Sequence, residues 1–243
     1  MERIPIYAHR GASAYELENT IEAFEKAKAL KADGIELDLQ VSKDSILVVF
    51  HDLDLTRLAG VRKNINDCTY KELSKYSIGS RFKRLLSTKR IMSFTQLVGW
   101  ANRENIALNI ELKESVLANT EALKNAIKTL KLPANSHFSS FHIELLKIVK
   151  EVRPDFETAF LVTKIFNWQT LRDLNFIDHV HAHRKFYKQP YLQACDEAKK
   201  GIRFYGINGK ESFLTNPHPA VIGWITDYPD KVRNVQQKNT TNT

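Results

Sequence analysis

Short runs of β-branched and aromatic residues alternate along this chain with segments of helical periodicity. Nine such runs predict strands, at 4–8, 34–41, 46–50, 106–112, 136–140, 158–162, 177–182, 202–207 and 221–225. Between them, apolar residues at helical spacing predict helices at 120–130, 143–152, 168–174 and 191–200. Strands that alternate with helices of this size are typical of βα units built around a parallel sheet.

Three further helix starts are indicated by local sequence. Asn19-Thr-Ile-Glu22 stands as a capping sequence ahead of an apolar helical face, and Ser93-Phe-Thr-Gln96 fits a capping box. A short helix is also predicted at 69–76.

One pair of strand runs breaks the alternation. Only four residues separate Val41 from Ile46, and a parallel crossover needs about a dozen or more. The two runs are therefore predicted to form an antiparallel hairpin, with Val41 opposite Ile46 and residue 36 opposite residue 51. Eight parallel strands remain, which is the number that closes a (β/α)8 TIM barrel. An open doubly wound sheet is the alternative, disfavoured because no Gly-x-Gly-x-x-Gly turn follows the first strand.

The length of 243 residues suits a single barrel domain, expected over residues 1–235. The connection between Asp52 and Ile106 lacks a linker-like composition, so we interpret it as an elaborated loop over the barrel mouth. The polar residues 236–243 are expected to form a disordered tail. The oligomeric state is left open.

Composition narrows the class of protein. The chain carries 36 basic and 28 acidic side chains, a formal net charge of +8, but Lys and Arg are spread along it, which favours a solvated surface over a nucleic-acid partner. We see no apolar run long enough for a transmembrane segment and no signal peptide. The isolated Cys68 and Cys195 disfavour a disulfide framework or structural zinc. These observations predict a soluble, cytoplasmic protein.

Two strands carry acidic residues on one face. Glu36 and Asp38 alternate with apolar residues, and Asn109, Glu111 and Lys113 do the same on a later strand. If both faces line the barrel mouth, three carboxylates converge and need a cation, and oxygen ligands suit Mg²⁺ or Ca²⁺. The alternative is that each strand shows only a solvent-facing edge.

Two histidines are predicted at strand ends. His9 closes the first strand, and His51 closes the return arm of the hairpin, beside the carboxylates. A histidine in such a place can act as general acid or base near pH 7. Arg10 and Lys113 add positive charge for an anionic group such as a phosphate. The alternative for each histidine is a hydrogen-bonded structural role.

The alternating His179-Val-His-Ala-His183 could form a metal-binding ladder, but nothing nearby in the sequence supports one. Only His183 is predicted close to the carboxyl end of its strand.

Several of these motifs, taken together, resemble the glycerophosphodiester phosphodiesterase family. The N-terminal motifs are His9-Arg-Gly-Ala-Ser-Ala-Tyr-Glu-Leu-Glu-Asn-Thr20, Ile35-Glu-Leu-Asp38, Ser42-Lys-Asp44 and Val48-Val-Phe-His-Asp52. The later ones are Glu111-Leu-Lys113, Ser139-Ser-Phe141, His183-Arg184, Tyr205-Gly-Ile-Asn208 and Thr226-Asp227. The resemblance spans nearly the whole chain.

The resemblance implies a TIM barrel that hydrolyses small glycerophosphodiester substrates to sn-glycerol 3-phosphate and an alcohol with one divalent cation. It also implies that the adjacent glycerol hydroxyl attacks phosphorus first, giving a cyclic phosphate. By matching positions it assigns metal binding to Glu36, Asp38 and Glu111, acid–base catalysis to His9 and His51, and substrate or phosphate binding to Arg10, Lys113, Glu18, His183 and Tyr205. Which histidine is the acid stays open.

A lysophospholipase D-like activity on lipid substrates is the alternative on the same barrel. A membrane-facing apolar loop would favour it. The segment Asp67–Lys89 is mostly polar and basic, so we interpret it as able at most to dock on anionic headgroups.

Overall fold

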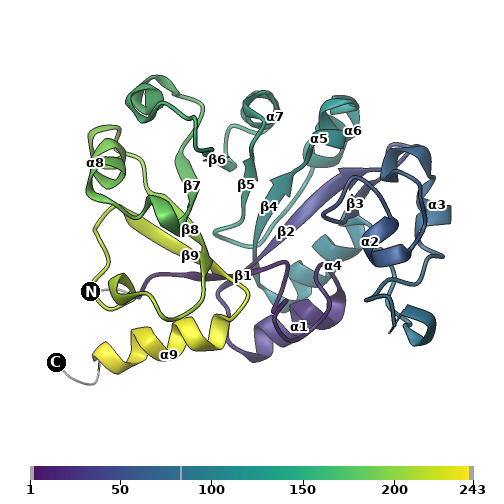
Figure 1. Cartoon of the computed structure of the whole chain (residues 1–243). Coiled ribbons are helices and arrows are strands. Elements are labelled where there is room, and N and C mark those ends of the chain that lie inside the picture. Colours follow the sequence, from purple (N-terminus) through teal and green to yellow (C-terminus); the bar gives the residue numbers. More distant parts are fainter. Residues whose placement is uncertain (1–2, 83, 241–243) are drawn as a thin grey trace.

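A closed ring of eight parallel strands forms the centre of the protein (Figure 1). The computed structural model describes residues 3–82 and 84–240. Around the ring the strands are β1 (Ile6–His9), β2 (Gly34–Val41), β4 (Ala107–Leu112), β5 (His137–Ser140), β6 (Glu157–Leu161), β7 (His179–His183), β8 (Ile202–Ile207) and β9 (Val221–Thr226). β1 pairs with both β9 and β2, which closes the ring. The predicted eight-stranded barrel is confirmed.

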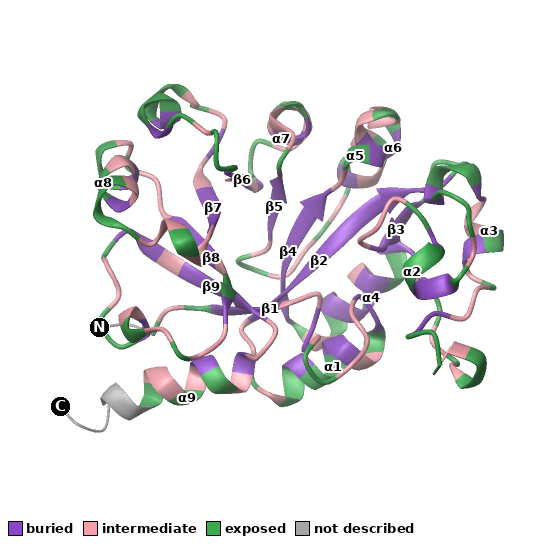
Figure 2. Cartoon of the chain, viewed as in Figure 1, coloured by how far each residue is buried: buried purple, intermediate pink, exposed green. Residues whose placement is uncertain are grey.

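Helices surround the ring and cover it from solvent. The longer ones are α1 (Ile21–Ala29), α4 (Phe94–Glu104), α6 (Thr120–Ile127), α7 (Ile143–Val152), α8 (Gln189–Glu197) and α9 (Pro229–Thr240). The short ones are α2 (Thr56–Ala59), α3 (Tyr70–Leu73), α5 (Glu114–Leu117) and the 3₁₀ turns η1 (Ile65–Asp67), η2 (Arg84–Leu86), η3 (Trp168–Asp173), η4 (Arg184–Phe186) and η5 (Ser212–Leu214). The strands are mostly buried, and the exposed residues lie on the helices and loops (Figure 2).

The capping sequences begin helices where they were predicted. The Thr20 side chain accepts a hydrogen bond from the Ala23 N–H, and Ser93 forms a capping box with Gln96. The predicted helix at 168–174 is the 3₁₀ turn η3 instead of an α-helix.

The predicted hairpin is present, but its predicted register is wrong by one residue. β3 (Leu47–Val49) runs antiparallel to β2, with Val41 opposite Leu47. The turn takes Ser45 into the left-handed region at φ 64°, and the Ser42 N–H donates to the Ile46 carbonyl at 2.9 Å. This three-residue loop, typical of a hairpin with a bulge, places Ser42 opposite Ile46.

The strand β2 is long enough to pair with two strands, β1 and β3, along the same edge. Its residues 34–36 pair with β1, and its residues 39–41 pair with β3. The hairpin therefore continues the barrel wall beyond the end of β1, at the carboxyl end of the barrel.

The segment between β3 and α4 packs around the hairpin. Its apolar residues form a separate small core with the hairpin: Val48, Phe50, Leu55, Leu58, Ala59, Ile65, Cys68, Leu73, Ile78 and Ile91. Of its described residues, only His51, just after β3, lines the cavity described below, so the rest of the segment borders one side of the barrel mouth.

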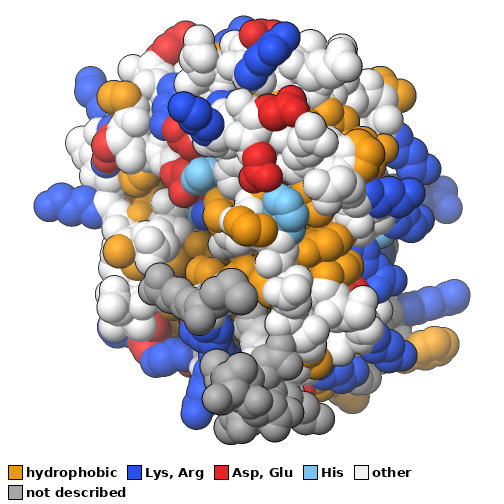
Figure 3. All heavy atoms as spheres, turned by 90° about the vertical axis from the view of Figure 1, so that its left-hand side faces the viewer, with side chains coloured by type: hydrophobic (Ala, Val, Ile, Leu, Met, Phe, Trp, Pro, Cys, Tyr) orange, Lys and Arg blue, Asp and Glu red, His pale blue; other side chains and the backbone are white. Residues whose placement is uncertain are grey.

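The chain end differs in part from the expected disordered tail. Helix α9 continues through residues 236–240, and residues 241–243 lie outside the described residues. In the described part of the chain, no helix combines the length and the apolar character needed to span a membrane. On the face seen in Figure 3, basic side chains are scattered, and apolar ones gather near the centre.

Candidate active site

A cavity of about 290 Å³ opens within the barrel and collects most of the predicted site residues. The predicted residues that line it are His9, Arg10, Glu36, His51, Glu111, Lys113 and Tyr205. Its other lining residues are Asn109, Ser139, Phe141, Leu161, His181 and Ile225. Seven residues predicted from distant parts of the chain therefore meet at one site.

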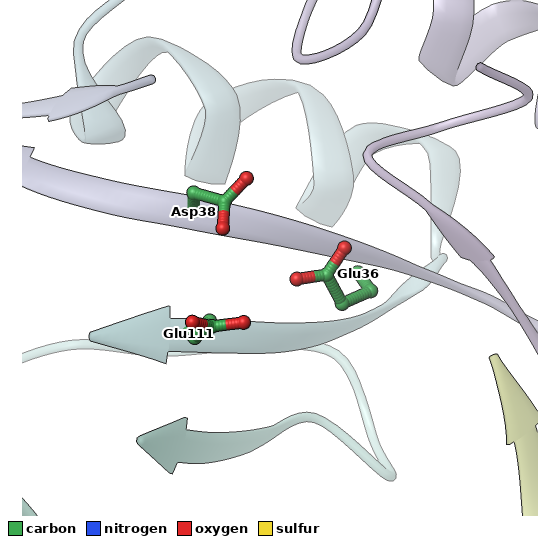
Figure 4. A group of neighbouring side chains, drawn as sticks. All are labelled: Glu36, Asp38 and Glu111. Carbon is green, nitrogen blue, oxygen red and sulfur yellow. The ribbon is translucent and has the colours of Figure 1, made fainter. Parts of the chain in front are cut away.

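Three buried carboxylates converge beside this cavity (Figure 4). Glu36 and Asp38 come from β2, and Glu111 comes from the neighbouring β4, where it pairs in register with Asp38. Each carboxylate offers an oxygen, and these oxygens lie within 4.8 Å of one another. The acidic strand faces thus point into the barrel, and the solvent-edge alternative does not hold.

The negative charges of the three carboxylates are only partly balanced by basic side chains of the protein. Burial, together with the nearby Asp38 charge, raises the pKa of Glu36 to about 8, and burial with the same neighbour raises the pKa of Glu111. Buried Glu36 Oε1 has no hydrogen-bond partner among the described residues. Unpaired carboxylate oxygens at this spacing fit a divalent cation with oxygen ligands, so the group could hold one.

Asp38 has a different environment because two cations flank it. Lys113 Nζ lies 3.1 Å from Asp38 Oδ1, and Arg10 Nε lies 3.1 Å from Asp38 Oδ2. Burial opposes ionisation, but the charges of these two side chains outweigh it and lower the pKa of Asp38. Lys113 also donates to Glu111 Oε1 at 2.6 Å.

The turn after β1 places Arg10 over the carboxylates. Arg10 takes a left-handed conformation at φ 54°, and its backbone N–H donates to Glu36 Oε2 at 2.9 Å. Gly11 follows at φ 84°, where an added Cβ would lie 2.7 Å from backbone and side-chain carbons of Ala23. The conformation and close packing of this turn thus require glycine at position 11.

Glu18 lies behind Arg10 and links it to the hairpin. Arg10 Nη1 donates to Glu18 Oε1 at 2.9 Å, and Arg57 binds both oxygens of Glu18 at 2.7 Å. Arg57 also binds Asp52, which lies 2.7 Å from Nδ1 of His51. The contacts form one chain in which acidic side chains alternate with basic ones from Glu111 to Asp52, and Asp52 then contacts the His51 ring: Glu111, Lys113, Asp38, Arg10, Glu18, Arg57, Asp52 and His51.

Each predicted catalytic histidine is held at Nδ1 by a carboxylate. His9 Nδ1 lies 2.6 Å from Asp227 Oδ1, and His9 Nε2 lies 3.9 Å from Glu36 Oε2. Burial opposes protonation of His9, but the Glu36 charge and the Asp227 hydrogen bond outweigh it and raise the pKa of the ring. Contacts at Nδ1 leave Nε2 of both rings available to a substrate in the cavity.

Two predicted binding residues lie at the rim. The Tyr205 ring lines the cavity and packs edge-on against His183, with centroids 5.4 Å apart. His183 does not line the cavity, and its Nδ1 accepts the Lys185 N–H. His181, two positions earlier on the same strand face, lines the cavity floor and is fully buried.

The sequence analysis missed Asp227, Asn109 and His181 as site residues. Asp227 directly follows the last strand, and Asn109 shares the strand face of Glu111, so strand-end position and alternation were available signals. Asn109 Oδ1 accepts a hydrogen bond from Ser139 Oγ at 2.9 Å, while its amide nitrogen has no described partner.

The fold and the carboxylate-lined mouth together define an α/β-barrel protein with a candidate metal-binding active site. Residues 9–231 match the family model described as the glycerophosphoryl diester phosphodiesterase family. A glycerophosphodiester phosphodiesterase of Caldanaerobacter subterraneus is 29% identical over 241 residues, covering 96% of this chain and 98% of that protein. A lysophospholipase D of Mus musculus is 44% identical over 73 residues, 30% of this chain and 22% of that protein.

Solved structures of two other phosphodiesterases have the same fold as this chain. A Thermotoga maritima glycerophosphodiester phosphodiesterase superimposes with a TM-score of 0.74 at 26% identity, over 97% of this chain and 99% of that one. An Oleispira antarctica phosphodiesterase, solved with its product sn-glycerol 3-phosphate, superimposes with a TM-score of 0.79 at 24% identity, over 96% of both chains. This chain belongs to the glycerophosphoryl diester phosphodiesterase family and is a phosphoric diester hydrolase.

Proposed function

We propose that this enzyme hydrolyses glycerophosphodiesters to sn-glycerol 3-phosphate and an alcohol, with a divalent cation held by Glu36, Asp38 and Glu111. The observation that carries the proposal is the convergence of these three buried carboxylates with the basic side chains of Arg10 and Lys113 and with two histidines around one cavity. The related structure with bound sn-glycerol 3-phosphate supports the assignment of the product.

The charges of the site suit this substrate. The three carboxylates together with Arg10 and Lys113 have a net charge of −1. A bound divalent cation changes this net charge to +1. A phosphodiester carries one negative charge, so its charge is opposite to that of the loaded site. Arg10 and Lys113 lie on either side of Asp38 and line the cavity, so both can bind phosphate oxygens. When bound, the cation supplies charge stabilisation to the phosphate as negative charge develops on it.

The two histidines supply proton transfer. We assign His9 and His51 as an acid–base pair, because each has Nδ1 on a carboxylate and each lines the cavity. One ring takes the proton from the attacking glycerol hydroxyl next to the phosphate, and the other gives a proton to the departing alcohol oxygen. The resulting cyclic phosphate is then opened by water with the same two groups in reversed roles.

Lysophospholipase D-like cleavage of lipid-bearing diesters is a second candidate. Two observations favour it: the 44% identity with the mouse lysophospholipase D over 73 residues, and the exposed apolar side chains of Phe82, Leu85 and Leu86 in the mostly polar and basic segment 67–89. The chemistry at phosphorus would be the same, and only the alcohol group would differ.

The test is a hydrolysis assay on choline, ethanolamine, inositol and lysophospholipid diesters, with the protein first stripped of metal and then supplied with Mg²⁺ or Ca²⁺. We expect cation-dependent release of sn-glycerol 3-phosphate, identified by phosphorus NMR, from the glycerophosphodiesters. Lysophosphatidic acid from lysophospholipids at a comparable rate would identify the second candidate. No cleavage of any diester with either ion would contradict both assignments.

A further inference from the structure

Three large apolar side chains project into solvent from the segment around η2. Phe82, Leu85 and Leu86 are 87%, 92% and 91% exposed, and we call them the apolar tip. In Figure 2 this segment lies at the lower right, below α2, and carries exposed residues. Apolar side chains grouped in this way on a surface mark a contact site for a partner.

The chain around the apolar tip carries only positive charge. No acidic residue occurs between Glu72 and Glu104, whereas that stretch holds seven basic residues. Of these, Arg81, Arg84 and Arg90 form no ion pair with any described residue. The partner of this surface must therefore combine an apolar interior with a negatively charged outer layer.

The apolar tip is anchored beside the barrel mouth. Lys89 Nζ lies 3.1 Å from Glu16 Oε2, in the same loop that carries Arg10 and Glu18. The Gly79 N–H donates to the carbonyl of Leu58, next to Arg57 of the charged chain, at 3.0 Å. The segment thus lies on the side of the molecule where the cavity opens.

We propose that the apolar tip docks this enzyme on an anionic lipid surface. Phe82, Leu85 and Leu86 enter the boundary between headgroups and acyl chains, while Arg81, Arg84 and Arg90 contact the acidic headgroups. Any consequence for catalysis rests on the proposed function: a docked enzyme holds its mouth close to diesters that carry an acyl chain.

Lipid fits this surface better than two other partners. A nucleic acid would use the basic residues but would leave three neighbouring apolar side chains without a role. A second copy of this chain would bring the same positive charges together at the contact, which opposes association.

The test is cosedimentation with vesicles of phosphatidylcholine alone and of phosphatidylcholine mixed with phosphatidylglycerol. We expect binding to the mixed vesicles only, weakened by high salt. The variant Phe82→Ser/Leu85→Ser/Leu86→Ser should bind at least about tenfold more weakly, because apolar insertion is lost. Arg81→Glu/Arg90→Glu should bind weakly as well, since each basic residue near an anionic surface contributes about fivefold.

A matched control has the same change of charge at the opposite end of the barrel. Lys128 and Lys131 are exposed and lie in the connection that leads into β5, so Lys128→Glu/Lys131→Glu should retain most of the vesicle binding. Thermal unfolding of every variant, followed by circular dichroism, verifies that the fold is kept.

Three results would overturn the proposal. They are absence of wild-type binding to anionic vesicles, equal binding by the triple serine variant, and a wild-type dimer in analytical ultracentrifugation that the triple variant abolishes. Binding of RNA that survives the serine substitutions and disappears with the glutamates would identify a nucleic-acid surface instead. Because sedimentation needs no turnover, vesicle binding and diester hydrolysis can each fail without the other.

Discussion

His9 Nδ1 lies 2.6 Å from Asp227 Oδ1, so the first strand of the barrel presents a ring that the residue after the last strand orients. The contact joins positions 218 residues apart and depends on the pairing of β1 with β9. Closure of the barrel therefore completes the site.

Asp227→Asn should lower turnover at least about tenfold, because an amide neither fixes the tautomer of His9 nor stabilises its protonated form. Ser13→Ala should have a smaller effect, since Ser13 only donates to the same Asp227 oxygen at 2.9 Å. Steady-state kinetics on one glycerophosphodiester compare the two variants. Equal turnover in Asp227→Asn and wild type would show that the contact is purely structural.

His9→Ala and His51→Ala should each lower turnover at least about a hundredfold while metal binding stays largely intact. The double variant His9→Ala/His51→Ala should have little less turnover than either single variant, because the loss of either histidine interrupts the same proton transfers. A substrate with a p-nitrophenolate leaving group should rescue the variant that lacks the acid and not the one that lacks the base. An equal response of both variants to that leaving group would disprove the paired assignment.

Chelator should abolish activity, and Glu36→Gln should weaken both metal binding and turnover. The reason is that only two basic side chains, Arg10 and Lys113, lie beside the three buried carboxylates. Glu121→Gln, an exposed carboxylate on α6, serves as the control and should behave like the wild type. Titration calorimetry with Mg²⁺ and Ca²⁺ measures the binding. Full activity of metal-stripped enzyme in excess chelator would contradict this prediction.

The metal-free protein should lose stability as pH rises toward 8. Burial and neighbouring carboxylates raise the pKa of Glu36 from 4.5 to about 8, so within that range the folded state holds a proton that the unfolded state releases. The free energy of unfolding then decreases with increasing pH. Urea unfolding at pH 5, 6.5 and 8 measures this free energy, which should decrease less steeply with pH in Glu36→Gln than in the wild type. The same pH dependence in both proteins would refute the raised pKa of Glu36.

Gly11→Ala should lower the free energy of unfolding by about 1–3 kcal/mol, because an alanine at φ 84° is strained and its Cβ would press on Ala23. Activity should also decrease, since Arg10 would move with the turn. Gly99→Ala is the matched control: it lies in α4 with no atom within 4 Å of the added Cβ, and should gain about 0.5–1 kcal/mol. Similar unfolding midpoints for both variants would argue against strain at Gly11.

Much of this fold was predictable because local periodicity encodes it. Glu36, Asp38 and Glu111 alternate with apolar residues, so the sequence places them on one face of each strand, and the structure shows that this is the inner face of the barrel. The hairpin register was missed by one residue because it depends on the left-handed conformation of Ser45, which the sequence pattern does not specify.

Contacts between residues far apart in the sequence could not be predicted from its periodicity. Asp227 meets His9 only through ring closure, and His181 lies in the cavity while His183 stands above it at the rim. Similarly, composition described the segment 67–89 as polar and basic, but only tertiary packing decides that Phe82 and Leu85 face solvent while Ile78 is buried.

The chain of alternating charges from Glu111 to Asp52 restricts how this site can evolve. Each member from Lys113 to Arg57 contacts partners of opposite charge on both sides, so a single reversal of charge creates two repulsive contacts at once. A lineage that changed Glu18 alone would remove one of the two carboxylate partners of both Arg10 and Arg57. New substrate preferences are therefore expected to arise through the neutral wall of the cavity, at positions such as Phe141 and Leu161, where single mutations leave the charge order untouched.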